Sequence, residues 1–581
     1  MNPSLSCFAD EGGSVNCFLW ILSRIHILLP RIYGIMPNMR RPCCSCRAVL
    51  YLGKEHAMKE DSKEKGLRLL EKGRRGIFRV IFSRSGLILV LLAVQVLFLF
   101  SIFHWFEAFL PHIYGGVVIF TVFMVLYLLN SHMDPTAKIT WLVVIMLLPV
   151  FGALLFLYTQ KNIGHRALQK HYAQLNEKTE DSLKQSPETE KALQQSDPGA
   201  AALFRYVRRS GCYPVYDRTA VTYFPLGEDK FKEMLIRLEQ AEHFIFLEYF
   251  IVNEGEMWGR ILEILARKVK EGVEVRMLYD GTCELSTLPH DYPERLRRLG
   301  IKCKMFAPVK PFVSTHYNYR DHRKILVIDG KLALTGGINL ADEYINAYEK
   351  YGHWKDTAVM VQGEAARSFT RMFLHMWYLD EKETDFDTFL NVPIPPQAEN
   401  GFVMPYGDCP LDQDKVGEQV YIDLLNRAQT YAHIMTPYLI LDGELENALT
   451  YAAKRGVDVR IILPGIPDKY IPFALALTHY KALLEAGVKI YEYTPGFIHA
   501  KVFVCDGREA VVGTINLDYR SLYHHFECAA YMWGTDCIPQ IEEDFELTQA
   551  KCREVTAGML REEPLKRRIL GFAAKAVAPL L

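Results

Sequence analysis

Two stretches of the chain carry the same unusual arrangement of side chains. "HRKILVIDG" (322–330) and "HAKVFVCDG" (499–507) each place a lysine two residues after a histidine and end in Asp-Gly. In both cases an asparagine follows the histidine by 17 positions. The His-x-Lys-x4-Asp spacing should arise by chance roughly 0.1 times in a chain of this composition. Two copies with matched offsets therefore indicate an internal repeat, which predicts a fold of two similar halves.

The repetition extends beyond this motif. "GVEVRMLYDG" (272–281) is matched by "GVDVRIILPG" (456–465), and each follows a helix-like stretch. Helices that alternate with short β-branched runs imply β-α-β units and a largely parallel or mixed sheet in each half. Pro, Asn and Gly concentrate in "NVPIPPQAENG" (391–401), which favours a boundary there. We therefore expect one α/β half over 201–390 and a second over 391–581.

The motif itself predicts a polar site on a hairpin. A histidine and a lysine two apart on a strand point to the same face, and an Asp-Gly pair between β-rich runs favours a tight turn. The turn folds the next small residue and the asparagine back beside the histidine, where a ligand can approach the backbone. The candidate residues are His322, Lys324, Asp329, Gly337 and Asn339 in the first half, and His499, Lys501, Asp506, Thr514 and Asn516 in the second.

Three apolar runs near the N-terminus favour membrane spans. They lie at about 87–106, 113–130 and 139–158, and each is near the length needed to cross the core of a bilayer. Buried core helices are the alternative, but residues 85–160 supply almost no polar surface for a soluble domain. We therefore expect residues 58–160 to be a basic segment followed by transmembrane helices.

The charges that flank these runs leave the orientation open. Nine Lys or Arg residues lie between Lys59 and Arg84, which favours a cytoplasmic location for that segment. Three crossings would then place the rest of the chain outside, yet Lys161, Arg166 and Lys170 follow the last run and favour the opposite side. The side of the membrane that the large domain occupies stays undecided.

Two further segments differ in composition from their surroundings. In residues 1–57 the apolar stretch "CFLWILSRIHILLP" is short and broken by Arg24 and Pro30, so it is neither a clean signal peptide nor a convincing span. We expect a poorly structured extension there. Residues 161–200 are rich in Gln, Lys, Glu and Ser, which predicts a polar helical linker.

Composition excludes several other classes. Lys and Arg total 67 against 68 Asp and Glu, a formal charge of -1, so the chain lacks the basic character of a nucleic-acid-binding protein. The 13 cysteines are irregularly spaced and form no pair of CxxC motifs. We therefore expect neither a structural zinc site nor a disulfide framework.

The two motif-bearing segments resemble a known family. "YRDHRKILVIDGKLALTGGINLADEY" and "HAKVFVCDGREAVVGTINLDYRS" resemble the paired signatures of the phospholipase D superfamily. From the first apolar run onward, most of the chain is similar to a bacterial cardiolipin synthase of that superfamily, including the Pro-containing run "ITWLVVIMLLPVFGALLFLY". The resemblance implies a multi-pass protein of the bacterial cell membrane. Its two α/β/α halves would be related by a pseudo-twofold axis.

The resemblance also implies a reaction and a role for each motif residue. One phosphatidylglycerol would transfer its phosphatidyl group to another, which yields cardiolipin and glycerol without a metal or other cofactor. By the family pattern His322 attacks phosphorus to form a phosphohistidine, and His499 acts as acid and then base. The motif lysines and asparagines would hold the non-bridging oxygens in the transition state. The two motifs are nearly symmetric, so the residues themselves do not assign these roles.

Two acids later in the chain could orient the histidines. A neutral histidine nucleophile needs an acceptor on its other ring nitrogen. "HWKDTAVMV" places Asp356 before a predicted strand, and "HFECAAYMW" places Glu527 at the matching position of the second half. A surface carboxylate is the alternative for Asp356. Asp329 and Asp506, in contrast, are expected to stabilise their hairpins rather than touch substrate.

Other functions remain open. A membrane-bound phospholipase D would use the same residues with water as the acceptor, whereas a nuclease fits the balanced charge poorly and an inactive membrane scaffold fits the intact motifs poorly. The partners expected are phosphatidylglycerol and an anionic bilayer, and the oligomeric state is unknown. "LKRRILGFAAKAVAPLL" at the C-terminus alternates cations with apolar residues and could lie on anionic lipid or pack as a terminal helix.

Overall fold

The computed structural model describes residues 114–131, 133–148, 163–308, 319–412 and 414–580, with a few isolated positions between 97 and 157. All of them belong to one compact unit, Glu60–Leu581. The predicted N-terminal extension at 1–57, the basic segment and nearly all of the apolar run at 87–106 lie outside the described residues.

Two apolar helices precede the α/β region, α5 (Tyr114–Leu129) and α6 (Pro135–Leu147). Helix α6 begins sharply because the carboxylate of Asp134 accepts the N–H groups of Thr136 and Ala137, and a proline occupies the first helical position. These helices coincide with parts of the predicted spans at 113–130 and 139–158. Among the described residues, no helix combines the length and the apolar character that a bilayer crossing requires. The three spans therefore stay a prediction.

The segment predicted as a solvated linker is helical, but it packs against the α/β region. It contains α8 (Ile163–Thr179), η3 (Glu180–Ser182), α9 (Pro187–Ser196) and the start of α10 (Pro198–Gly211). Tyr172, Leu175 and Leu193 are buried in the core that both halves share. Sparse apolar residues at helical spacing suffice to seat one face of each of these helices, while most of their polar residues stay exposed.

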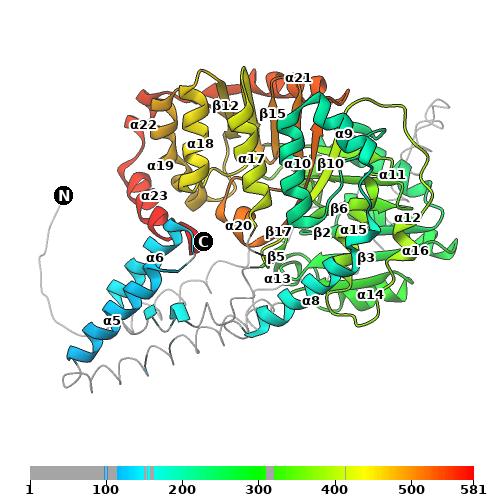
Figure 1. The fold of residues 1–581 in the computed structure, drawn as a ribbon, viewed down its shortest axis with the longest axis horizontal. Helices are drawn as coiled ribbons and strands as arrows, with labels where there is room; N and C mark the ends of the chain where they lie inside the picture. The colour runs from blue at the N-terminus through cyan, green and yellow to red at the C-terminus, as the bar shows by residue number, and fades with distance from the viewer. Residues whose placement is uncertain are drawn as a thin grey trace, which may run out of the picture. The chain divides into compact units, whose positions relative to one another are not determined.

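The first half forms a seven-stranded sheet, drawn in cyan to green in Figure 1, with the strand order β1-β9-β7-β6-β2-β3-β4. Strands β2 and β3 are buried along almost their whole length, as expected where helices cover both faces of a sheet. Its strands are β1 (Ala220–Phe224), β2 (Phe244–Tyr249), β3 (Glu274–Asp280), β4 (Lys302–Phe306), β6 (Lys324–Ile328), β7 (Leu332–Gly336) and β9 (Ala358–Gln362). The helices are α11 (Gly227–Glu239), α12 (Glu256–Lys270), α13 (Cys283–Ser286), α14 (Tyr292–Arg298), η5 (Asp342–Ile345), α15 (Ala366–Trp377) and α16 (Asp387–Leu390).

The second half forms the larger sheet, with the order β10-β17-β16-β15-β11-β12-β13-β18. Its strands are β10 (Phe402–Asp408), β11 (Tyr431–Met435), β12 (Asp458–Pro464), β13 (Lys489–Tyr493), β15 (Val502–Cys505), β16 (Glu509–Gly513), β17 (His525–Trp533) and β18 (Cys552–Glu554). Its helices are α17 (Val416–Arg427), α18 (Gly443–Lys454), α19 (Tyr470–Ala486), α20 (Tyr519–Tyr523), α21 (Ile538–Gln549), α22 (Ala557–Glu562), α23 (Leu565–Val577) and η6 (Ala578–Leu580).

The two halves have the same topology, which confirms the predicted repeat. Read from β10 to β13, the second sheet repeats the first sheet from β1 to β4 strand for strand, and β18 is an addition at its edge. In both sheets three successive strands run parallel and the motif hairpin runs antiparallel beside them. The helix α16 ends at Leu390 and β10 begins at Phe402, so the predicted boundary at 390/391 lies between the two sheets.

Each half also lends a short strand to the other. Strand β5 (Arg320–Asp321) ends directly before the first motif histidine and pairs in parallel with the start of β17. Strand β14 (Gly496–Ile498) ends directly before the second motif histidine and pairs in parallel with β8 (His353–Lys355) of the first half. This reciprocal pairing brings the histidine of each half against a strand of the other half.

Candidate active site

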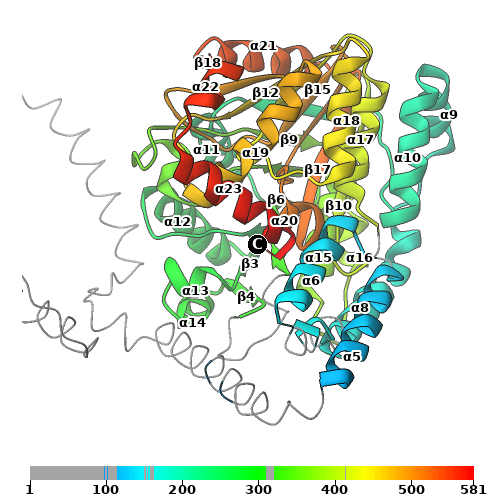
Figure 2. The ribbon, with the colours of Figure 1, turned by 90° about the vertical axis from the view of Figure 1, so that its left-hand side faces the viewer.

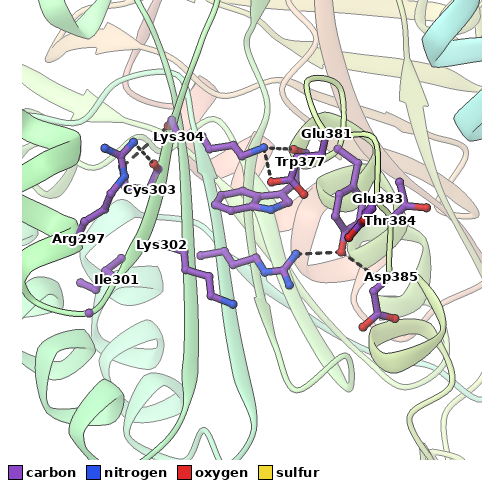
Figure 3. A pocket seen from close by; sticks show the side chains of 13 residues that line it. Arg297, Ile301, Lys302, Cys303, Lys304, Trp377, Glu381, Glu383, Thr384 and Asp385 are labelled. Atoms are coloured by element: carbon purple, nitrogen blue, oxygen red, sulfur yellow. Dashed lines mark hydrogen bonds and ion pairs between the residues drawn. The ribbon is translucent and has the colours of Figure 1, made fainter.

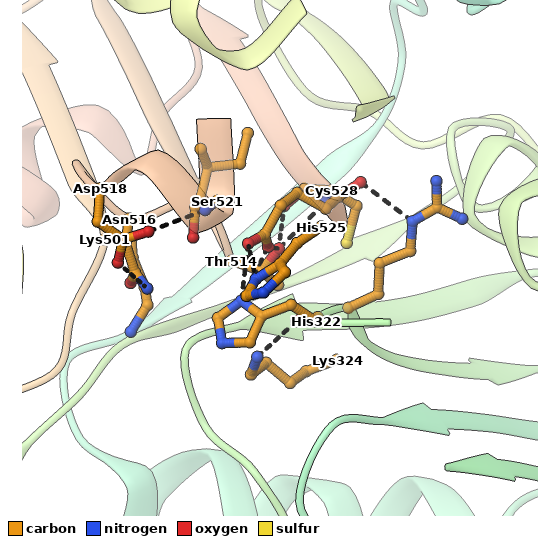
Figure 4. A network of polar contacts seen from close by, with 12 residues as sticks. His322, Lys324, Lys501, Thr514, Asn516, Asp518, Ser521, His525 and Cys528 are labelled. Carbon is orange, nitrogen blue, oxygen red and sulfur yellow. Dashed lines mark hydrogen bonds and ion pairs between the residues drawn. The ribbon is translucent and has the colours of Figure 1, made fainter. Parts of the chain in front are cut away.

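A cavity of about 800 Å³ lies between the halves, and both motif histidines line it. Its polar wall includes Asn339 and Asn516, and one end is apolar, with Ile471 and Leu475 of α19. Figure 4 shows the motif side chains of the two halves meeting in one polar network. Groups from distant parts of the chain thus reach a common space large enough for a lipid headgroup.

The first motif histidine is held by a carboxylate of the second half. Nδ1 of His322 lies 2.8 and 3.0 Å from the two oxygens of Glu527. The backbone N–H of His322 donates to the carbonyl of Phe526 at 3.0 Å, so the pairing of β5 with β17 fixes the separation of imidazole and carboxylate. With Nδ1 occupied, Nε2 is the ring nitrogen left for chemistry.

The second motif histidine is held in the same way by the first half. Nδ1 of His499 lies 2.7 Å from Oδ2 of Asp356, and the backbone N–H of His499 donates to the carbonyl of Lys355 at 2.7 Å. The sequence placed an acid in each half but did not say which histidine it would meet. In the structure each acid meets the histidine of the opposite half.

Burial keeps both imidazoles neutral. It lowers the pKa of His499 to about 4, with the nearby Lys501 ammonium acting in the same direction. Burial also lowers the pKa of His322 well below its ordinary value, against the pull of Glu527. Burial opposes ionisation of Glu527 as well, but His322, His525 and the Lys324 ammonium together outweigh it and hold the pKa of this carboxyl well below its usual range. The pair is therefore a neutral histidine on an ionised carboxylate.

The motif lysines lie beneath their histidines. Nζ of Lys324 donates to the backbone carbonyl of His322 at 2.5 Å, and Nζ of Lys501 donates to the carbonyl of His499. Burial lowers the pKa of Lys324 to about 8 and that of Lys501 to about 7. Each ammonium is thus poorly solvated, which strengthens its attraction to an anion placed above it.

The motif asparagines line the cavity. Oδ1 of Asn339 accepts the N–H of Ile251 at 2.9 Å and its Nδ2 donates to the hydroxyl of Tyr344 at 2.8 Å. Nδ2 of Asn516 donates to Asp518 at 3.1 Å, and its buried Oδ1 has no hydrogen-bond partner among the described residues. Both amides are held at the cavity wall, as expected of phosphate-binding groups.

Gly337 and Thr514 were predicted to contact substrate, and that contact stays a prediction. Neither residue is among those that line the cavity. A Cβ added at Gly337 would stand 2.0 Å from Oδ1 of Asp356, and the hydroxyl of Thr514 donates to Glu527. The two small residues therefore admit or hold the carboxylates that orient the histidines, because the hairpin returns them one layer below the ligand space.

The motif aspartates also lie away from the cavity. The carboxylate of Asp329 accepts three backbone N–H groups, from Glu242, His243 and Phe244, at 2.7–2.9 Å. Asp506 accepts three equivalent N–H groups at the start of β11. Both aspartates adopt positive φ angles at the hairpin turn, 52° and 53°. They tie the motif hairpin to the neighbouring strand and do not belong with the groups that reach a ligand.

A third histidine was missed in the sequence. The ring of His525 lies beside that of His322, with centroids 5.3 Å apart, and it lines the cavity. Its Nδ1 is 3.7 Å from Oε1 of Glu527, and neither ring nitrogen has a hydrogen-bond partner among the described residues. In the first half the same position relative to the acid is Trp354, whose ring packs on His499 at 5.4 Å. Aligning "HWKD" (353–356) with "HHFE" (524–527) would have revealed this difference.

The first motif histidine and two neighbouring side chains also have the spacing of a cation site. One ligand atom from each of His322, His525 and Glu527 lies within 4.8 Å of the others. The carboxylate is already bonded to His322 through Nδ1.

A second hollow, of about 780 Å³, lies against β4 and α15 (Figure 3). Its cations are paired within the protein. Lys304 meets Asp380 at 2.5 Å and Glu381 at 2.7 Å, and Arg276 meets Glu274 at 2.6 Å. Neither motif histidine lines this hollow, so the cavity between the halves is the candidate active site.

The fold and the crossed histidine–carboxylate pairs define a phospholipase D-type enzyme. The family model described as "Cardiolipin synthase, PLD-like domain" matches residues 234–377 and 421–548, and "Phospholipase_D-nuclease N-terminal" matches 119–159. Cardiolipin synthases of Alkalihalophilus pseudofirmus and Geobacillus kaustophilus are 33% and 34% identical to the chain. These alignments cover 82% and 79% of it and 95% and 92% of the relatives. The chain belongs to the cardiolipin synthase family of phospholipase D-like phosphatidyltransferases.

Two further proteins are similar to the chain, one in sequence and one in fold. An uncharacterized protein of Streptococcus mutans is 56% identical over 79% of the chain and 99% of that protein. A phosphatidylserine synthase of Haemophilus influenzae has a similar fold, with a TM-score of 0.50 at 16% identity, over 62% of this chain and 95% of that one.

Proposed function

We propose that the protein transfers the phosphatidyl group of one phosphatidylglycerol to a hydroxyl of another, forming cardiolipin and glycerol. The observation that carries the proposal is the pair of histidines on one cavity, each bonded through Nδ1 to a carboxylate of the opposite half. Transfer between two phosphodiesters needs a nucleophile and a proton donor on opposite sides of phosphorus, and two such histidines can supply both.

In the first step, Nε2 of His322 attacks phosphorus and the bond from phosphorus to the glycerol oxygen breaks. The imidazole becomes positively charged as the new bond forms, and the carboxylate of Glu527 stabilises that charge through Nδ1–H. His499 enters this step protonated and gives its Nε2 proton to the departing glycerol oxygen. The substrate phosphate favours this protonated form by its negative charge, against the effect of burial.

In the second step, neutral His499 takes the proton from a hydroxyl of the second phosphatidylglycerol. The alkoxide oxygen attacks phosphorus, the bond to His322 breaks and cardiolipin forms. His499 ends the cycle protonated, ready for the next donor lipid. Lys324, Lys501 and the two motif asparagines stabilise the negative charge that shifts onto the non-bridging oxygens in both steps.

The same residues could pass the phosphatidyl group to water. Ile471, Pro472 and Leu475 make one end of the cavity apolar, which favours a lipid acceptor over water there. We further propose that the apolar N-terminal segments anchor the protein in the bacterial cell membrane by more than one pass. The exposed apolar surface of α5 and α6 supports this proposal, with Ile119 73% and Met146 72% exposed.

The test of the reaction uses the full-length protein in detergent with phosphatidylglycerol, followed by separation of the lipids. Cardiolipin and free glycerol in equal amounts are expected. Phosphatidic acid as the only product would replace the proposal with hydrolysis. The variants His322→Ala and His499→Ala should each lose turnover, and near-normal activity of either would remove that histidine from the mechanism.

The assignment of the two histidines has a separate test. The substrate is phosphatidylglycerol labelled in its phosphatidyl part. The variant His499→Ala should accumulate an acid-labile phosphatidyl adduct, which mass spectrometry would locate on His322. An adduct on His499 in the variant His322→Ala would show that the roles are reversed.

A further inference from the structure

The C-terminal helix α23 has two opposite apolar faces. One face is seated on the protein, where Gly571 and Ala574 are buried against α19. The contact is close, because a Cβ added at Gly571 would stand 2.2 Å from the carbonyl oxygen of Ala474. The helix is therefore a fixed part of the fold and not a loose tail.

The other face of α23 is exposed although it is strongly apolar. Leu565, Ile569 and Phe572 recur at the spacing of one helical face and are 68%, 60% and 80% exposed. A packed terminal helix would need only its buried face to be apolar. A second stripe of large apolar side chains directed away from the protein marks a surface that contacts something else.

The charges of α23 indicate what that surface meets. Within Leu565–Val577 there are four cations and no Asp or Glu. Arg567 is bonded to Glu563 and directed to α19, where it lies over the rings of Tyr470 and Phe473. The other three cations, Lys566, Arg568 and Lys575, are exposed beside the apolar stripe. An apolar stripe flanked by cations fits an anionic lipid surface better than an apolar protein groove.

The helix lies beside residues that line the cavity. Ile471 and Leu475 of α19 and Ala578, which follows α23, are among the lining residues, and Leu475 forms one buried cluster with Ala574 and Ala578. The helix also contacts α6, whose Thr140 donates to the carbonyl of Ala576 at 2.9 Å. Figure 2 shows α23 between α19 and α6.

We propose that α23 lies in the surface of an anionic bilayer with Leu565, Ile569 and Phe572 among the acyl chains. This position presents the apolar end of the cavity to the lipid, so that a phosphatidylglycerol molecule enters sideways with its headgroup reaching the histidines. The proposal rests on the proposed function and extends it to the route by which the substrate enters.

The test compares the same full-length protein on a bilayer substrate and on a dissolved one. The triple variant Leu565→Ser/Ile569→Ser/Phe572→Ser removes the stripe without touching the cavity. Its kcat/KM for phosphatidylglycerol in proteoliposomes should fall about tenfold or more, because three apolar contacts with the bilayer are lost. Its kcat/KM for monomeric dihexanoyl phosphatidylglycerol should stay within about twofold of the wild type, the range expected of surface substitutions.

A matched control removes three exposed large apolar side chains elsewhere. Ile236, Tyr451 and Leu547 are 51%, 54% and 59% exposed and lie outside both α23 and the cavity. Their triple substitution by Ser should leave both activities unchanged. If the α23 variant loses activity equally on both substrates, or on neither, the docking role is refuted. Absence of cardiolipin formation by the wild type on both substrates would instead refute the proposed function.

A second measurement does not depend on activity. In the variant Phe572→Trp, the added indole should be quenched by lipids brominated along their acyl chains when vesicles contain phosphatidylglycerol. If brominated lipids quench the fluorescence of the variant by no more than that of the wild type, the added indole lies in water and the proposal is overturned, even if the triple variant fails to fold.

Discussion

Nδ1 of His322 lies 2.8 Å from Oε1 of Glu527, although 205 residues separate them in the chain. The short parallel pairing of β5 with β17 brings these two residues together. The reciprocal pairing of β14 with β8 gives His499 and Asp356 the same relationship. Neither half can therefore orient its own histidine. Catalytic geometry depends on the docking of the two halves.

Replacing Glu527 by glutamine should impair catalysis far more than stability. The amide keeps the size of the side chain but removes the charge that orients His322 and stabilises its cationic form. We expect kcat for cardiolipin formation to fall by about 10²–10⁴-fold with little change in KM. The matched control is Glu542→Gln, because Glu542 is bonded to Nδ1 of His433 at 2.7 Å outside the cavity. Equal losses in the two variants would contradict the orienting role.

As pH rises, kcat/KM should begin to fall at a pH well below the ordinary pKa of lysine. Burial lowers the pKa of Lys501 to about 7 and that of Lys324 to about 8, and the reaction needs both in the charged form. Because a lowered pKa means that the proton is lost earlier as pH rises, kcat/KM should decline through pH 7 to 8. A pH–rate profile checks this, with circular dichroism over the same range as the control for folding. Constant activity into the ordinary range of lysine would contradict it.

The side chain of His525 should take part in the reaction. Its counterpart in the first half, Trp354, should only pack against His499. The imidazole of His525 lines the cavity beside His322, and among the described residues Nε2 has no hydrogen-bond partner, so it can donate to a phosphate oxygen. We expect His525→Phe, which keeps an aromatic ring, to lower kcat/KM about tenfold and alter its pH dependence. The control Trp354→Phe should leave the pH profile unchanged. Wild-type kinetics in His525→Phe would reduce this residue to a packing role.

Adding a methyl group at Gly337 should displace the carboxylate that orients His499. A Cβ there would stand 2.0 Å from Oδ1 of Asp356, which must move and take its bond to His499 with it. We expect Gly337→Ala to lose about 1–3 kcal/mol of stability and about tenfold or more in kcat. The control Gly443→Ala meets nothing within 4 Å and should leave both quantities nearly unchanged. Thermal unfolding and steady-state rates provide the comparison.

Removing the motif aspartate of the first half should act on stability. The carboxylate of Asp329 bonds three backbone N–H groups, which Asp329→Ala would leave without their acceptor. We expect a loss of about 2–4 kcal/mol in the free energy of unfolding, measured with denaturant. At a temperature where the variant is folded, activity per folded molecule should remain near that of the wild type. A large loss of kcat in the folded variant would show that Asp329 takes part in catalysis.

The features that could be predicted from the sequence are those that local spacing determines. The repeated motif, the Asp-Gly hairpins and the alternation of helices and strands require only neighbours in the chain. They led to two similar halves, to the motif residues and to the two acids. The sequence predicted a polar helical segment at 161–200 but not the burial of Tyr172 and Leu175, which depends on a partner surface from distant residues.

The sequence by itself determined that two histidines, two lysines and two acids would be presented in equivalent positions of two α/β halves, because turn chemistry and strand periodicity are local. Only the tertiary structure decided which acid meets which histidine, and that Gly337 and Thr514 serve the acids while His525 faces the cavity. The physical reason is that these contacts arise from strands exchanged between halves. When a chain contains two equivalent partners, spacing along it carries no information about which of them will be adjacent in space.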